Sequence, residues 1–192
     1  MKKFKFTALL ATLVVSGGVL AACSSDEETP AASSSEAASS EVVESSEDVV
    51  STASVSDQAD VLEAALSADG NWIIATTADV TFTNDVTVAG EFHNKDDASG
   101  DIYRKFALYA QDSDRVVTDE FTITVPKLVV ESENFNIVHG TVQGDVEVKA
   151  NGFVLNGATV EGNVTFETQE QLDSATLDQD GGSVTGEVTV AE

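Results

Sequence analysis

The feature that most constrains the fold of this chain is an internal repeat of 18 residues. Residues 135–148 align at that offset with residues 153–166, and apolar character persists at Ile137/Leu155 and Val148/Phe166. The identical pairs are Phe135/Phe153, Thr141/Thr159, Val142/Val160, Gly144/Gly162 and Val146/Val164. Short apolar segments with glycine between them at a fixed period are typical of a β-solenoid, in which each repeat is one coil that buries its core only by stacking on its neighbours.

A third copy of the motif lies closer to the C-terminus. Residues 184–190 repeat the Val-x-Gly-x-Val-x-Val pattern at a longer offset of 24. We expect Gly144, Gly162 and Gly186 at the corners of the coils, where the chain changes direction. The longer interval predicts an outward loop over residues 167–182.

Two alternatives to a right-handed parallel β-helix remain open. Apolar residues also recur every six positions, a spacing that resembles the left-handed hexapeptide helices of acyltransferases. The positions are Val142, Val148, Val154, Val160, Phe166 and Leu172. The spacing ends there, and the small residue that those turns need is often missing, so the right-handed form is favoured. A β-sandwich with accidental similarity between its strands is the second alternative.

An opening helix and a run of short β-strands complete the predicted domain, residues 57–192. Val61, Leu62, Ala65 and Leu66 form one apolar stripe, which predicts a helix over residues 57–69. We expect Ser56 or Asp57 to cap this helix and Gly70 to end it. From residue 71 onward apolar and polar residues alternate in short runs, so the domain is otherwise all-β. Five valines are expected in the shared core: Val142, Val146, Val160, Val164 and Val188.

The first 23 residues have the layout of an export signal. Lys2, Lys3 and Lys5 precede a short apolar run at residues 6–19, and the single cysteine of the chain follows at Cys23. Leu20-Ala21-Ala22-Cys23 resembles the bacterial lipobox. The resemblance implies cleavage of residues 1–22 and a diacylglyceryl group on Cys23, hence a lipoprotein anchored on the extracytoplasmic face of the cell membrane.

The segment between the anchor and the domain, residues 23–56, is composed almost wholly of Ser, Ala, Glu, Asp, Val and Thr. Such a composition cannot bury enough apolar surface to offset the entropy of ordering the chain, so we predict a disordered linker. One cysteine cannot form an internal disulfide, and an exported protein without disulfides favours a Gram-positive cell envelope.

The coils at residues 140–148 and 158–166 resemble those of the bactofilin-like, polymer-forming β-helix proteins. The resemblance covers roughly residues 121–192, and it implies a right-handed β-helix with a scaffolding role and no cofactor. The chain departs from that family in its export signal and at residues 93–120, which interrupt the rhythm of the coils.

The interrupted region carries the candidate ligand patch. The chain has 34 acidic and 9 basic residues, a net charge of −25 that excludes nucleic acid as a default partner. Four bases nevertheless lie within residues 95–115: Lys95, Arg104, Lys105 and Arg115. If residues 102–110 form one strand, Tyr103, Lys105 and Tyr109 share a face that can hold a sugar or an acidic polymer. The alternative is ordinary cross-strand packing on an exposed sheet.

Signals for catalysis or metal binding are weak. His93 and His139 are the only histidines, and two histidines in an acidic chain do not by themselves indicate a triad. His139 occupies the coil position of Gly157, which predicts a solvated corner. Acidic clusters at residues 96–101 and 178–181 complete no calcium loop. We therefore predict no catalytic residue, no cofactor and no metal site.

Two functional classes follow from these observations. The first is a non-enzymatic scaffold or surface-interaction module, whose partners are the membrane, a cell-wall glycan or another surface protein. Its last coil is followed by only two residues after Val190, so we expect weak self-association through the C-terminal coil. The second is a β-helix protein that binds or cleaves cell-wall or capsular glycan. Stacked aromatics and paired carboxylates on one face would favour the second class, and a flat polar face with an exposed end coil would favour the first.

Overall fold

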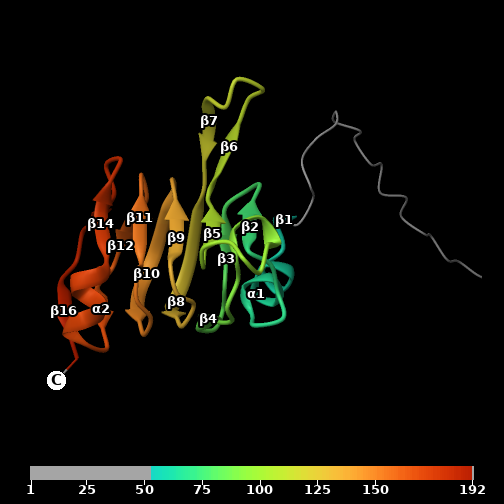
Figure 1. The fold of residues 1–192 in the computed structure, drawn as a ribbon. Helices are drawn as coiled ribbons and strands as arrows, with labels where there is room; N and C mark the ends of the chain where they lie inside the picture. The colour runs from blue at the N-terminus through green and yellow to red at the C-terminus, as the bar shows by residue number, and fades with distance from the viewer. Residues whose placement is uncertain (1–52, 192) are drawn as a thin grey trace, which may run out of the picture. The chain divides into compact units, whose positions relative to one another are not determined.

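The computed structural model describes residues 53–191, and these form an all-β unit built on parallel sheets (Figure 1). The first sheet has six strands in the order β1-β2-β5-β9-β11-β14, all parallel. Its strands are β1 (Ala53–Ser56), β2 (Ile73–Thr76), β5 (Arg104–Ala107), β9 (Phe135–Val138), β11 (Val154–Asn156) and β14 (Thr176–Gln179). The predicted export signal at residues 1–22 and the predicted lipidation site Cys23 lie outside the described residues.

The second sheet has eight strands, also parallel, centred on the two longest strands of the unit. These are β8 (Thr122–Val130) and β10 (Thr141–Val148), which pair along most of their length. The shorter strands pair with them or with one another: β3 (Val80–Thr81), β4 (Val86–Val88), β12 (Thr159–Glu161), β13 (Val164–Phe166), β15 (Ser183–Val184) and β16 (Val188–Val190).

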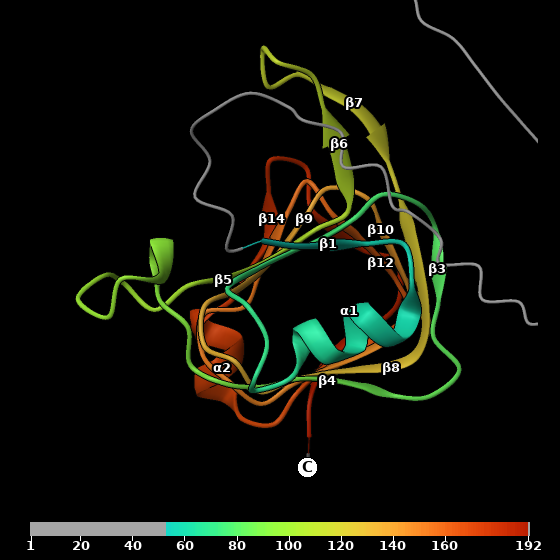
Figure 2. The ribbon, with the colours of Figure 1, turned by 90° about the vertical axis from the view of Figure 1, so that its right-hand side faces the viewer.

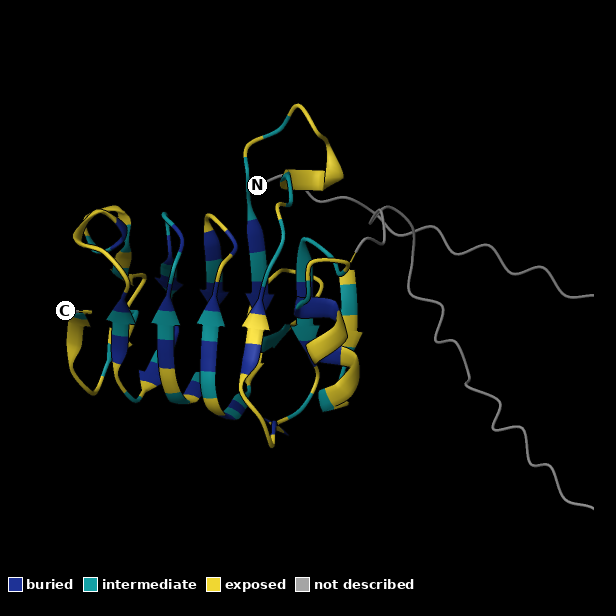
Figure 3. Cartoon of the chain, turned by 90° about the horizontal axis from the view of Figure 1, so that it is seen from below, coloured by how far each residue is buried: buried dark blue, intermediate teal, exposed yellow. Residues whose placement is uncertain are grey.

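The register between strands confirms the repeat. Val142 pairs with Val160 and Val146 with Val164, which is the offset of 18. The third copy follows at the offset of 24, because Val164 pairs with Val188. Each repeat therefore adds one row of strands to both sheets, and the rows lie side by side (Figure 3).

The core lies between the two sheets. Val142, Val146, Val160 and Val164 are at most 1% exposed, as predicted. The prediction for Val188 is wrong, since its side chain is 41% exposed. Val188 belongs to β16, the last row of the described strands, where no further row covers the side chains (Figure 3).

Glycines mark the bends of the second sheet, as the repeat predicts. Gly144 has φ 145°, and a Cβ there would overlap the carbonyl oxygen of Val125. Gly162 lies against the carbonyl of Gly144, and Gly186 lies against that of Gly162. The close approach of successive rows excludes side chains at this bend.

The N-terminal boundary of the unit lies earlier than predicted. Residues 53–56, assigned to the linker, form β1, which pairs with β2 at the edge of the first sheet. An edge strand is half exposed, so alternating Ser and Val suffices. Helix α1 is Ala59–Leu66, shorter than 57–69, and its N-cap is Gln58 rather than Ser56 or Asp57. Ser56 Oγ accepts a hydrogen bond from the amide of this cap residue at 3.0 Å. Its buried residues Leu62 and Leu66 cover the first row of the core, and α1 lies across the space between the sheets (Figure 2).

The interruptions of the repeat have a structural explanation. Residues 109–120 contain an antiparallel hairpin of β6 (Tyr109–Gln111) and β7 (Val117–Glu120), which projects beyond the parallel strands (Figure 1). A 3-10 turn, η1 (Asn94–Asp96), lies in the preceding segment. The loop expected at residues 167–182 instead contains β14 and helix α2 (Gln169–Ser174), because Thr168 and Gln171 form a capping box that starts the helix.

Candidate ligand-binding surfaces

The four basic residues that lie close together in the sequence are separated in the structure. Arg115 lies in the exposed turn of the β6–β7 hairpin, and Lys95 lies in η1, both with positive φ. Arg104 is 0% exposed, whereas its neighbour Lys105 lies half-buried on the outer face of β5. Of the four bases, only Lys105 remains with the aromatic residues predicted beside it.

Arg104 is bound almost entirely by backbone carbonyls. Its Nε donates to the carbonyl oxygen of Asn71 at 3.0 Å, and Nη2 donates to those of Ala65 and Ser67 at 2.8 and 2.9 Å. Nη1 donates to the carbonyl of Ala89 and to Ser132 Oγ. Three of these carbonyls follow or end α1, so the guanidinium fixes the C-terminal end of the helix to the sheets.

The environment of Arg104 is apolar apart from these acceptors. The guanidinium carbon lies 4.1 Å from the ring centre of Phe92, which is a cation–π contact. Burial lowers the pKa of Arg104 to about 10, so the group remains a cation at neutral pH. Each nitrogen of the guanidinium donates to an acceptor, and these hydrogen bonds join α1 to the sheets at the N-terminal end of the unit.

The strand expected over residues 102–110 is broken between β5 and β6 at the fully buried Leu108. Of the predicted patch, Lys105 therefore lies on β5 and Tyr109 on β6, and Tyr103 directly precedes β5. Lys105 Nζ donates to Tyr109 Oη at 3.0 Å and lies 5.1 Å from the centre of the Tyr109 ring. The two side chains meet across the outward position of Ala107, which is only 5% exposed.

Two aromatic residues, His139 and Trp72, extend this patch beyond the predicted side chains, and Glu120 borders it. The Tyr109 ring meets the His139 ring edge-on with 4.8 Å between centres, and His139 Nδ1 lies 3.1 Å from Glu120 Oε1. The Tyr103 ring meets Trp72 at 6.2 Å between centres. Burial, with a smaller contribution from Tyr109, raises the pKa of Tyr103. We call Trp72, Tyr103, Lys105, Tyr109 and His139 the aromatic–lysine patch.

Only the position of His139 had a signal in the sequence. His139 has φ 55° and lies against Gly157 of the next repeat, at the predicted corner, but its side chain is only 30% exposed and contacts Tyr109 and Glu120 rather than being freely solvated. Trp72 and Glu120 are distant from the patch in sequence, and it is the parallel pairing of β2, β5 and β9 and the return of the hairpin that place them there.

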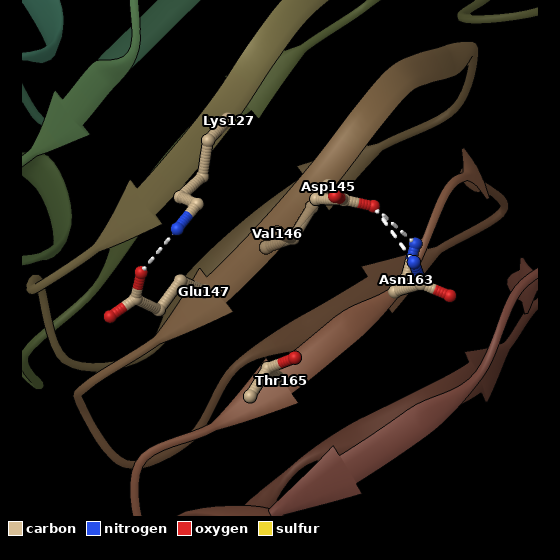
Figure 4. Close-up of a pocket in the computed structure, with 6 residues that line it drawn as sticks. All are labelled: Lys127, Asp145, Val146, Glu147, Asn163 and Thr165. Carbon is tan, nitrogen blue, oxygen red and sulfur yellow. Dashed lines mark hydrogen bonds and ion pairs between the residues drawn. The ribbon is translucent and has the colours of Figure 1, made fainter. Parts of the chain in front are cut away.

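A second candidate surface is a shallow hollow on the outer face of the eight-stranded sheet. It is lined by Lys127, Asp145, Val146, Glu147, Asn163 and Thr165 (Figure 4). Lys127 Nζ lies 3.0 Å from Glu147 Oε2, and Asp145 Oδ1 accepts from the backbone and side-chain amides of Asn163 at 2.9 and 3.2 Å. Lys127 lowers the pKa of Glu147 through this hydrogen bond. The charged side chains that line this hollow therefore already have partners within it.

The same face carries ladders of polar side chains that run from row to row. Thr122, Thr141, Thr159 and Ser183 are in register. Thr159 Oγ1 and Ser183 Oγ are 3.1 Å apart. A second ladder runs from Thr124 through Gln143 to Glu161, with both hydrogen bonds at 3.0 Å. We call this outer face of the eight-stranded sheet the polar wall; its side chains form hydrogen bonds with one another across the rows.

The remaining candidates, His93 and the two acidic clusters, lie apart from these surfaces in exposed loops and turns. His93 Nδ1 lies 2.8 Å from the Gly100 carbonyl oxygen; this contact, with a smaller contribution from Glu91, raises the pKa of His93. Asp97 accepts from the amide and hydroxyl of Ser99, which lowers its pKa. Asp180 lies in the turn after β14. Within residues 53–191, no three side chains of His, Cys, Asp or Glu lie together as a metal site would require.

No family model, no curated protein and no solved structure matches this chain. In the part of the chain that the structure describes, no helix is long and apolar enough to span a membrane.

Proposed function

We propose that this protein is a bacterial lipoprotein, anchored through Cys23 on the extracytoplasmic face of the membrane, that acts as a non-enzymatic structural or surface-interaction module. Its domain is a right-handed parallel β-helix of the bactofilin-like type, linked to the anchor by the acidic segment 23–56. The lipobox supports the anchor. The offsets of 18 and 24 residues between paired strands support the β-helix.

The observation that carries the structural role is the difference between the polar wall and the last row of strands. On the wall, charged and polar side chains bind one another from row to row. In the last row, the outer edges of β14, β15 and β16 pair with no other described strand, and Val188 is 41% exposed beside the half-buried Val184 and Val190. Unpaired backbone groups next to apolar side chains form a template for another strand.

The partner that fits this edge is a second copy of the chain. A matching row of strands would continue both sheets and would cover Val188. Glu187 and the acidic character of the chain oppose such an approach, so association is weak and strengthens as salt screens the repulsion.

The anchor is tested by Cys23→Ser in the full chain. We expect this variant to be released from membranes or to remain unprocessed, because the thiol that receives the lipid is lost. Ala22→Gly, which keeps a small residue before the cysteine, serves as the control. Unchanged processing and membrane retention of Cys23→Ser would remove the lipoprotein assignment.

Self-association is tested by Val188→Cys in the full chain, in which Cys23 is the only other cysteine. Under mild oxidation this variant should form disulfide-linked dimers, and more of them at high salt. Val116→Cys is the matched control, since Val116 is 59% exposed but lies at the hairpin. Equal cross-linking at both positions, or none at Val188→Cys, would contradict association through the last row.

A further inference from the structure

Lys105 differs from the lysines of the polar wall in having no carboxylate partner. Lys127 lies 3.0 Å from Glu147, and Lys149 lies 3.4 Å from Glu147 and 3.7 Å from Glu131. Lys105 instead donates to the neutral hydroxyl of Tyr109, and within residues 53–191 no acidic side chain pairs with it. In a chain with 34 acidic residues, this is a cation whose counter-charge is not supplied by the described fold.

The surroundings of Lys105 are those of a ligand platform. Tyr103 lies two residues before Lys105, and Tyr109 lies four residues after it. The ammonium lies 5.1 Å from the centre of the Tyr109 ring, and the Tyr103 ring lies beside Trp72. The outward Ala107 and Val138 beside it are 5% and 8% exposed, which gives the patch an apolar floor. His139 supports the Tyr109 ring, and Trp72 supports the Tyr103 ring.

The chemistry of these groups selects a class of ligand. Aromatic rings present apolar faces with a polar edge, which suits the C–H face of a pyranose ring bordered by hydroxyl groups. An ammonium has three donors, and only one is used by Tyr109. Its remaining donors favour a charged acceptor, because hydrogen bonds between ions are about twice as strong as neutral ones.

We propose that the aromatic–lysine patch is a binding site for an acidic sugar, a pyranose ring that carries a carboxylate or a phosphate. Tyr103 and Tyr109 contact the ring, and Lys105 binds the anionic group. The site lies on the outer face of the six-stranded sheet and is independent of the last row of strands.

The net charge of the chain sets the size of the ligand. Repulsion between exposed charges is screened beyond about 8 Å at physiological ionic strength. Glu120, which lies 3.1 Å from His139 and opposite Tyr109, repels a second anionic group at the border of the patch, so a single anionic group at Lys105 fits this site better than a long polyanion. Short acidic oligosaccharides or the end of a chain fit this site best.

The test is a calorimetric or NMR titration of the full chain in detergent micelles with three probes. These are a hexuronic acid disaccharide, the same disaccharide with its carboxylates reduced to alcohols, and a hexose phosphate. We expect the wild-type chain to bind at least one acidic probe about tenfold or more tightly than the neutral disaccharide, a difference of about 1.4 kcal/mol. The acidic probe that binds distinguishes a carboxylated from a phosphorylated glycan.

Two variants and a control make the result specific. Lys105→Gln should remove the preference for the acidic probe. Tyr109→Phe keeps the ring but removes the hydroxyl that positions the ammonium, so it should weaken this preference. Lys127→Gln, a lysine already paired on the other sheet, should bind like the wild type. Urea unfolding of each variant checks that the fold is kept. Absence of binding to both acidic probes, an unchanged preference in Lys105→Gln, or an equal loss in Lys127→Gln would overturn the proposal.

Discussion

The two ends of the stack of strands are built from different kinds of residues. At the N-terminal end, α1 covers the first row, and Leu62 and Leu66 are 0% exposed. At the C-terminal end, the last row carries the same repeat motif as the rows before it, yet Val188 is 41% exposed, whereas its partner Val164 is fully buried. The motif is the same in both rows, and only the presence of a following layer differs.

This comparison shows that a repeat determines the rows of strands but does not supply the layer that covers the first or the last row. Each row buries its apolar side chains only where another layer covers it. The N-terminal end is completed by elements outside the repeat, namely α1 and the buried Arg104, whose hydrogen bonds join the end of α1 to the sheets. In the described residues the C-terminal end has only α2, which packs Leu172 against the side of the core.

The largest effect should come from removing the cation that completes the N-terminal end. Arg104→Met would keep a long side chain but would leave several buried carbonyls without a donor. We expect a loss of about 3–5 kcal/mol in the free energy of unfolding. The measurement is urea unfolding followed by circular dichroism and by the fluorescence of Trp72, the only tryptophan.

Lys105→Met is the control for this prediction, because it makes the same change at the adjacent position of the same strand but on the outer face. It should alter the free energy of unfolding by less than about 0.5 kcal/mol. Similar losses in the two variants would mean that the carbonyl network does not determine the stability of this end.

The next effect compares two paired valines directly. Val164→Ala should cost about 1–3 kcal/mol, from lost burial and the cavity that remains. Val188→Ala should cost less than about 1 kcal/mol, because its side chain is already partly in water. Urea unfolding of the two variants measures both losses. A loss at Val188→Ala as large as at Val164→Ala would show that the last row is covered in solution.

The sequence predicted most of what repeats and the helix that covers the first row, but not the arginine that joins this helix to the sheets. The rows, the inward valines and the glycine bends follow from matches between residues 18 or 24 positions apart. Arg104 has the alternation of an inward residue, in phase with Phe106 and Leu108. Its burial could not be predicted from the sequence, since a buried charge needs partners and the acceptors of Arg104 are carbonyls from distant segments that no local pattern reveals.

The other differences have local causes. β1 was assigned to the linker because an edge strand needs few apolar residues. Helix α2 has a signal in the sequence, the capping box of Thr168 and Gln171, which lies outside the repeat motif. The aromatic–lysine patch was half predicted: alternation placed Tyr103, Lys105 and Tyr109 on one face, but Trp72 and His139 come from other rows.

A smaller effect tests whether α2 contributes to the C-terminal end. Thr168→Ala would remove the side chain that accepts from the Gln171 amide, and we expect a loss of about 1 kcal/mol. Thr165→Ala, on the outer face of the neighbouring strand, is the control and should change the free energy of unfolding by less than about 0.5 kcal/mol. If Thr168→Ala behaves like this control, α2 is not part of what stabilises the open end.

The smallest effect concerns the polar wall, which is common to both ends, and it depends on pH. The hydrogen bond from Lys127 lowers the pKa of Glu147, and the charges of Lys127 and Lys149 add to the shift. A carboxyl whose pKa is lower in the folded state stabilises the fold above its unfolded pKa of about 4.3, and this contribution is lost as the pH falls through the folded pKa. Glu147→Gln should therefore weaken the dependence of unfolding free energy on pH between about pH 5 and pH 3. Because both partners are partly in water, added salt should reduce the difference between variant and wild type. Parallel pH profiles for the two proteins at low salt would show that the wall gains no stability from this pair.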